Sequence, residues 1–170
     1  IVAALDFQDA AVLRGIDNLT QRHLLVGRSG RYQLSHELLR NVLYDDLPAA
    51  SRPALHGRVA AVIEAHRPEE VELLAHHFRA GGLPDRAAVY LEQAAVRAIS
   101  VSAYSTAVDH LAQAAEALAQ GGVSPTQRFR VLSRLEEILD LLARRADQEK
   151  VLAEMQLCAS GSAVVDVIRR

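Results

Sequence analysis

The sequence predicts a mostly α-helical chain in which a short segment with one β-hairpin precedes an array of antiparallel helix pairs. Half of the 170 residues are apolar, and over most of the chain they recur at helical spacing. Only the stretch 24–34 breaks that spacing, around a turn that contains glycine. From residue 69 onward, helical stretches alternate with short connections. We therefore expect one segment over residues 1–47 and a helical domain over residues 48–170.

The first segment is predicted as helix, hairpin, helix. The first helix spans residues 8–22 and has one apolar side: Val12, Leu13, Ile16 and Leu19. Residues 24–26 and 32–34 flank the turn GRSG, whose glycines permit a positive φ, so they should pair as a hairpin. The next helix, over residues 37–47, also has one apolar side: Leu38, Leu39, Val42, Leu43 and Leu47. Both apolar faces need a neighbour to bury against.

His36 stands where the second strand enters this helix. A histidine at such a junction can cap the helix, pack into a core, or contact an anion at the helix N-terminus, where free backbone N–H groups favour negative charge. The residues alone leave these roles open.

The remaining helices are marked by caps and glycines. Ser51 is a candidate cap with Pro53 in the first turn, and Arg67-Pro68 ends that helix. Ser124-Pro125 is the same signal later in the chain. Five helices are expected after residue 68, over residues 69–80, 85–100, 105–120, 125–144 and 147–158. Short loops make them antiparallel pairs.

An internal similarity supports stacked pairs. Shifting the chain by 20 residues superposes the alanines and leucines of two helices: Ala87, Leu91, Ala94 and Ala95 on Ala107, Leu111, Ala114 and Ala115. Small side chains at this spacing let helices approach closely, which favours an α-solenoid. The stretch AYSTAVDHLAQAAEAL is similar to the second helix of a tetratricopeptide repeat.

Composition limits the possible functions. A net charge of −2 gives no general attraction to nucleic acid or acidic membranes. Cys158 is the only cysteine, so no internal disulfide is possible, and we expect a cytoplasmic location. No apolar run approaches the roughly 20 residues of a membrane helix.

No catalytic or metal site is expected. The only lysine, Lys150, lies within a predicted helix, so a phosphate-binding P-loop is absent. The stretch HELLR begins like a zinc-protease motif, but its second ligand position is Arg40. His76 and His77 are adjacent and point about 100° apart on a helix, so a role at a helix interface is favoured over metal binding.

The helix, hairpin, helix order raises a winged helix. Arginines between residues 14 and 40 give a local positive excess, which flanking aspartates cancel. The segment 21–28 also lacks the Asn- and Gln-rich face that reads base edges. We therefore expect a winged helix used for protein packing, with direct DNA contact as a less favoured alternative.

One family resemblance covers nearly the whole chain. Its specific parts are Ser35-His36-Glu37-Leu38-Leu39-Arg40, Tyr44, Arg52, Leu55-His56 and Leu74-Ala75-His76-His77-Phe78. This pattern resembles the region after the ATPase core in STAND-class signalling ATPases, and most of all in the large ATP-binding LuxR-type transcriptional regulators. Ser35-His36-Glu37 is similar to the Met-His-Asp motif of that class, with Ser in place of Met and Glu in place of Asp.

The resemblance implies a non-catalytic coupling module within a longer regulator. A winged helix would be followed by a tetratricopeptide-like sensor that receives a protein or small-molecule effector. It implies that His36 contacts the ADP phosphate in the full-length parent, whose cofactors are ATP and ADP, and that the fragment itself has no cofactor. The expected partner is the nucleotide-binding domain of the same polypeptide, with DNA bound only by another domain. The alternative is an autonomous tetratricopeptide-type interaction scaffold.

Overall fold

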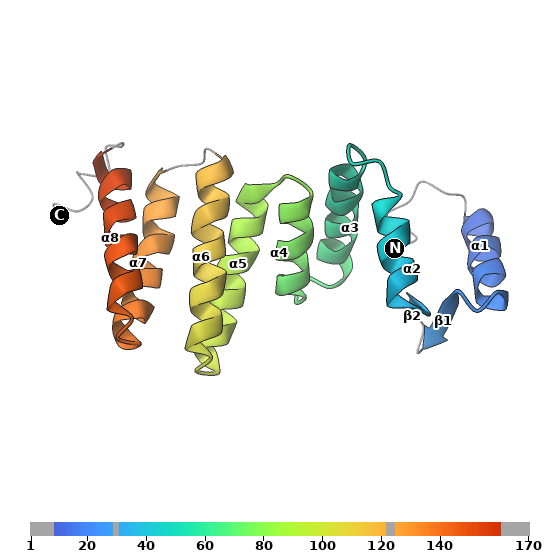
Figure 1. Ribbon diagram of the computed structural model, residues 1–170, viewed down its shortest axis with the longest axis horizontal. Coiled ribbons are helices and arrows are strands. Elements are labelled where there is room, and N and C mark those ends of the chain that lie inside the picture. Colours follow the sequence, from blue (N-terminus) through green and yellow to red (C-terminus); the bar gives the residue numbers. More distant parts are fainter. Residues whose placement is uncertain (1–8, 29–30, 122–124, 161–170) are drawn as a thin grey trace.

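The protein is a row of helices that starts from a small hairpin segment (Figure 1). A computed structural model describes residues 9–28, 31–121 and 125–160. Within these ranges the chain is mostly helical and has one antiparallel two-stranded sheet, as the sequence predicts. No helix in the described ranges is both long enough and apolar enough to cross a membrane.

The first segment has the predicted order of elements. It contains α1 (Asp9–Gln21), β1 (Leu25–Arg28), β2 (Arg31–Leu34) and α2 (Glu37–Asp45). The strands pair with Leu25 opposite Leu34. Part of the predicted GRSG turn, Ser29 and Gly30, lies outside the described residues, as does the predicted start of α1 at Gln8. The hairpin is confirmed, and the winged-helix assignment stays a prediction.

This segment has little core of its own. None of the described residues before Ala60 is buried. On α1, Leu13 is 61% exposed, and on α2, Leu38 is 75% exposed. The apolar faces that the sequence predicts are therefore present, but within the described chain they are left largely in contact with solvent.

Six helices follow in sequence order within the described residues. They are α3 (Arg52–His66), α4 (Val71–Ala80), α5 (Pro84–Ser100), α6 (Tyr104–Gly121), α7 (Pro125–Leu141) and α8 (Arg145–Ser160). Each of these helices packs chiefly on its neighbours along the chain, so the row extends as Figure 1 shows. The helical class is confirmed, and the tetratricopeptide-like solenoid of antiparallel pairs stays a prediction.

The core lies inside this row. A smaller cluster of buried residues joins α3, α4 and the start of α5 around Leu74 and Phe78, and a larger one runs from α4 to α8. The 20-residue shift superposes buried positions on buried positions: Ala87, Leu91, Ala94 and Ala95 on α5, and Ala107, Leu111, Ala114 and Ala115 on α6. The similarity thus reflects two helices that bury matching faces, with alanines where they approach.

Two details of the helix ends differ from the prediction. Ser51 precedes α3, but its side chain makes no capping hydrogen bond; the corresponding prediction for Ser124 lies outside the described residues. The helix predicted to reach residue 144 ends at Leu141, because Ala143 turns the chain with a φ of 54°. Ala143 N–H donates to Asp140 O and Arg144 N–H to Leu139 O, the bond pair of a Schellman motif. Glycine usually occupies this position, so the stop is hard to recognise when alanine does.

Candidate functional site

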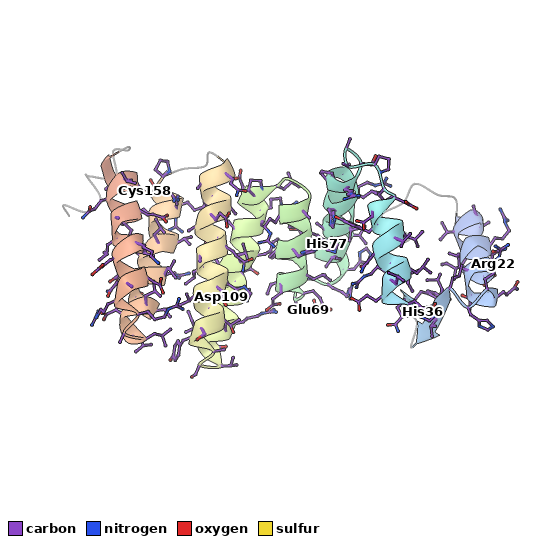
Figure 2. All side chains as sticks on the ribbon, viewed as in Figure 1. Arg22, His36, Glu69, His77, Asp109 and Cys158 are labelled. Carbon is purple, nitrogen blue, oxygen red and sulfur yellow. The ribbon has the colours of Figure 1, made fainter. Side chains whose placement is uncertain are left out.

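His36 directly precedes α2 and has an extended backbone, at φ −130° and ψ 133°. Its side chain makes no capping hydrogen bond and is exposed, so it neither caps the helix nor packs in a core. Figure 2 labels it at the hairpin end of α2. Beside it, the Ser35 hydroxyl oxygen is buried without a hydrogen-bond partner among the described residues. Two of the roles that the sequence left open for His36 are therefore unsupported.

A cluster of three histidines lies further along the row, where α3 packs on α4. It consists of His56 on α3 and of His76 and His77 on α4, and we call it the histidine cluster. One ring nitrogen of each residue lies within 4.8 Å of one from each of the other two. His56 Nδ1 and His77 Nδ1 are 2.9 Å apart, so one of the two rings donates the hydrogen between them. Figure 2 labels His77 on α4.

Two residues tie the histidine cluster to the first segment. The hydroxyl of Tyr44, on α2, lies 3.0 Å from His56 Nε2, which leaves Nδ1 of that ring directed at His77. The Arg52 guanidinium lies over the Tyr44 ring, 4.9 Å from its centroid. Arg52 also donates to the carbonyl oxygens of Asp45 and Leu47, at 2.8 and 3.1 Å, and so holds the C-terminal end of α2 against α3.

A close backbone approach brings α3 and α4 together at this point. A Cβ atom added to Gly81, just after α4, would lie 3.0 Å from the backbone nitrogen of Gly57 and 3.0 Å from His77 O. Gly57 follows His56 directly. The absence of a side chain at Gly81 therefore allows the contact that places His56 beside His77.

Burial and the neighbouring imidazoles lower the pKa of two rings of the cluster, His56 and His77. Desolvation first, and then the neighbouring His56 and His76, lower the pKa of His77 to about 4. Desolvation and the charge of His76 also lower the pKa of His56. At neutral pH these two imidazoles are therefore neutral, with a lone pair on one nitrogen of each ring.

The structure brings together residues that the sequence treated separately. Five residues from the specific parts of the STAND-class resemblance form one contiguous set: Tyr44, Arg52, His56, His76 and His77. Adjacent positions on α4 disfavour a metal site made by His76 and His77 alone. The third histidine comes from α3, and only the packing of α3 on α4 reveals it.

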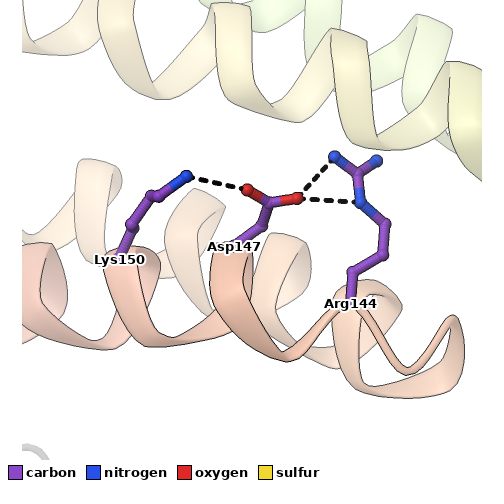
Figure 3. Close-up of polar contacts among 3 residues, drawn as sticks. All are labelled: Arg144, Asp147 and Lys150. Atoms are coloured by element: carbon purple, nitrogen blue, oxygen red, sulfur yellow. Dashed lines mark hydrogen bonds and ion pairs between the residues drawn. The ribbon is translucent and has the colours of Figure 1, made fainter.

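A second feature is a charged groove of about 400 Å³ between α6, α7 and α8. Its lining holds four carboxylates and three cations, all three of which are paired. Asp147 accepts from Arg144 Nη2 at 2.7 Å and from Lys150 Nζ at 3.1 Å (Figure 3), and these hydrogen bonds lower its pKa. Arg128 donates to Glu154 at 2.6 Å. Among the described residues that line the groove, every cation is paired and none is left for a phosphate.

Cys158 is buried. Arg128 lies 3.5 Å from its sulfur.

Comparisons with protein-family models, with curated proteins and with solved structures find nothing that matches this chain.

Proposed function

We propose that the chain is a non-catalytic coupling module of a cytoplasmic STAND-type transcriptional regulator. In this proposal the first segment is a winged helix that docks on the nucleotide-binding domain of the same polypeptide. The helices after residue 47 form a tetratricopeptide-like solenoid that receives an effector. Nucleotide binding belongs to the parent protein, and this chain transmits its state.

The observation that carries the proposal is the solvent-facing apolar surface of the first segment. Leu13 and Leu38 are 61% and 75% exposed, and Val42 and Leu43 on α2 are each about half exposed. Exposed apolar side chains on two helices of one small segment are typical of a surface that another domain covers. An ATPase domain of the same polypeptide is the occupant that the STAND-class motif implies.

His36 is the contact we propose with nucleotide. Its exposed ring stands at the N-terminus of α2, where the helix dipole favours an anion. A charge-assisted hydrogen bond from this imidazole to an ADP phosphate, worth about 1.5–3 kcal/mol, would shift a closed-to-open equilibrium by roughly 10- to 150-fold. In this proposal His36 holds the parent protein in its resting state while ADP is bound.

The row from α3 to α8 supports the effector-binding role. A second groove, of about 380 Å³ and lined mostly by apolar residues, lies between α5, α6 and α7. Its apolar lining includes Val96, which is 51% exposed, and Leu141, which is 64% exposed. A groove of this size and lining suits a small molecule or a short apolar peptide.

The test uses the full-length parent. The variant His36→Ala should release ADP faster and raise basal activity, without a change in melting temperature. The control is His23→Asn, which removes another exposed histidine of the same segment and keeps a residue that tolerates its positive φ of 56°. If ADP release is the same in both variants, or if His36→Ala unfolds the domain, His36 is structural and the proposal fails.

The autonomous scaffold remains the second candidate because both core clusters lie after residue 59. The row α3–α8 then binds its partner without reference to nucleotide. A Walker A motif upstream in the gene supports the coupling module, and a complete gene without one supports the scaffold.

A further inference from the structure

We propose that His56, His76 and His77 form a binding site for a divalent transition-metal ion, with Zn²⁺ as the ion that fits best. This inference goes beyond the proposed function and does not depend on it. Three histidine nitrogens are a common protein ligand set for zinc, and the fourth tetrahedral position would be filled by water.

The geometry favours a shared ion. The ring centroids form a compact triangle, with His56 5.1 Å from His77, His56 5.8 Å from His76, and His76 5.2 Å from His77. Nitrogen atoms bound to one tetrahedral zinc ion are ~3.3 Å apart. The candidate nitrogens already lie within 4.8 Å of one another, so side-chain rotations suffice to reach that spacing. The adjacent His76 and His77 can share one ion because the third ligand, His56, approaches from another helix.

The neighbouring residues suit a metal site. Histidine ligands usually donate their second ring N–H to an oxygen atom, which fixes the orientation of the ring. His56 is placed for this arrangement, because its Nε2 lies 3.0 Å from the Tyr44 hydroxyl while its Nδ1 is directed at the cluster. Arg52 in turn holds the Tyr44 ring.

An ion at this position would join α3 to α4 directly beside the contact with α2. The three ligands come from two helices, and the Tyr44 hydrogen bond extends the site to a third. Metal binding would therefore stabilise the junction between the first segment and the helical row.

The experiment titrates this 170-residue chain with Zn²⁺ in competition with a chromophoric chelator, and with Co²⁺, whose visible absorption reports four-coordinate geometry. We expect one ion per chain and a higher melting temperature with Zn²⁺. His76→Ala should weaken binding by at least about 100-fold, since a ligand contributes more than an outer partner, whose loss costs roughly 10- to 100-fold. Tyr44→Phe removes such an outer partner, so it should weaken Zn²⁺ binding by roughly 10- to 100-fold.

His76 is exposed, so His76→Ala should leave the metal-free melting temperature unchanged, which separates loss of a ligand from loss of folding. The control is His66→Ala, which removes an exposed histidine at the end of α3, the helix that carries His56, and should bind Zn²⁺ as the unsubstituted chain does. If the unsubstituted 170-residue chain binds no Zn²⁺ at micromolar concentrations, or if His76→Ala binds it as tightly as that chain does, the site does not exist.

Discussion

The hydroxyl of Tyr44 lies 3.0 Å from Nε2 of His56 and so links α2 to α3 through side chains. No described residue of α2 is buried, which means that a hydrophobic core does not make this connection. The Tyr44–His56 contact and the hydrogen bonds of Arg52 therefore hold the first segment on the helical row. Because polar contacts of partly exposed side chains are weak, this junction should be the first part of the row to open.

Arg52→Gln should loosen α2 without unfolding the rest of the protein. The substitution removes the guanidinium that donates to Asp45 O and Leu47 O and covers Tyr44. We expect the free energy of local opening of α2 to fall by about 1–2 kcal/mol, measured by amide hydrogen exchange. Arg40→Gln is the control, because Arg40 is 64% exposed and, among the described residues, forms an ion pair with Glu37 alone, on its own helix. Equal exchange in the two variants would contradict the role of Arg52.

Gly81→Ala should destabilise the contact between α3 and α4. The added Cβ would lie 3.0 Å from the Gly57 backbone nitrogen and 3.2 Å from its Cα, so the two helices must separate. A cost of about 1–3 kcal/mol in the free energy of unfolding is expected from such overpacking.

The matched control for this prediction is Gly57→Ala. A Cβ there meets only Leu83 Cδ1, at 3.9 Å, and alanine is preferred to glycine within a helix by roughly 0.5–1 kcal/mol. The free energy of unfolding, measured with urea, should therefore fall for Gly81→Ala and rise for Gly57→Ala. A loss at Gly57 as large as that at Gly81 would mean that the close approach is not the cause.

Ala114→Leu should overpack the interface of α5 and α6. Ala114 is fully buried, and the larger side chain should lower the free energy of unfolding by about 1–3 kcal/mol. Ala112→Leu, two positions earlier on the exposed side of α6, should change it by less than about 0.5 kcal/mol. Thermal melting checks both, and an unchanged melting temperature for Ala114→Leu would show that this face tolerates bulk.

Tyr90→Phe should reduce stability near neutral pH more than in acid. The Tyr90 hydroxyl donates to Glu64, as does Arg86, and these contacts lower the pKa of Glu64 below its ordinary value of 4.5. A lowered folded-state pKa stabilises the protein above pH 4.5, and this contribution disappears as the pH falls through the folded-state value.

The phenylalanine variant keeps the ring that stacks on Phe78, with centroids 5.5 Å apart, so it removes chiefly the hydroxyl. We expect a loss of about 1–2 kcal/mol at pH 7, measured by denaturant unfolding, and a smaller loss at about pH 3. A difference that is constant across this range would show that the Tyr90 hydroxyl does not act through the charge of Glu64.

The helices themselves were predictable because their signals are local. Apolar spacing placed α1 to α8 within a few residues, and the glycines of the hairpin turn broke the helical period where the strands lie. The ends were less predictable where the stop signal was atypical. Ser102 and Ala143 both adopt a positive φ after a helix, at 58° and 54°, although glycine is the residue expected there.

The sequence by itself determined the helical class, the hairpin, the matching buried faces of α5 and α6, and the position of His36 at the start of α2. These follow from residue spacing over one or two turns. Tertiary structure alone decided that His56 meets His76 and His77, since that contact joins residues 20 and 21 positions apart through the approach of Gly81 to Gly57. Spacing along one helix describes the direction of its own side chains, whereas the distance to a second helix depends on how the two backbones pack.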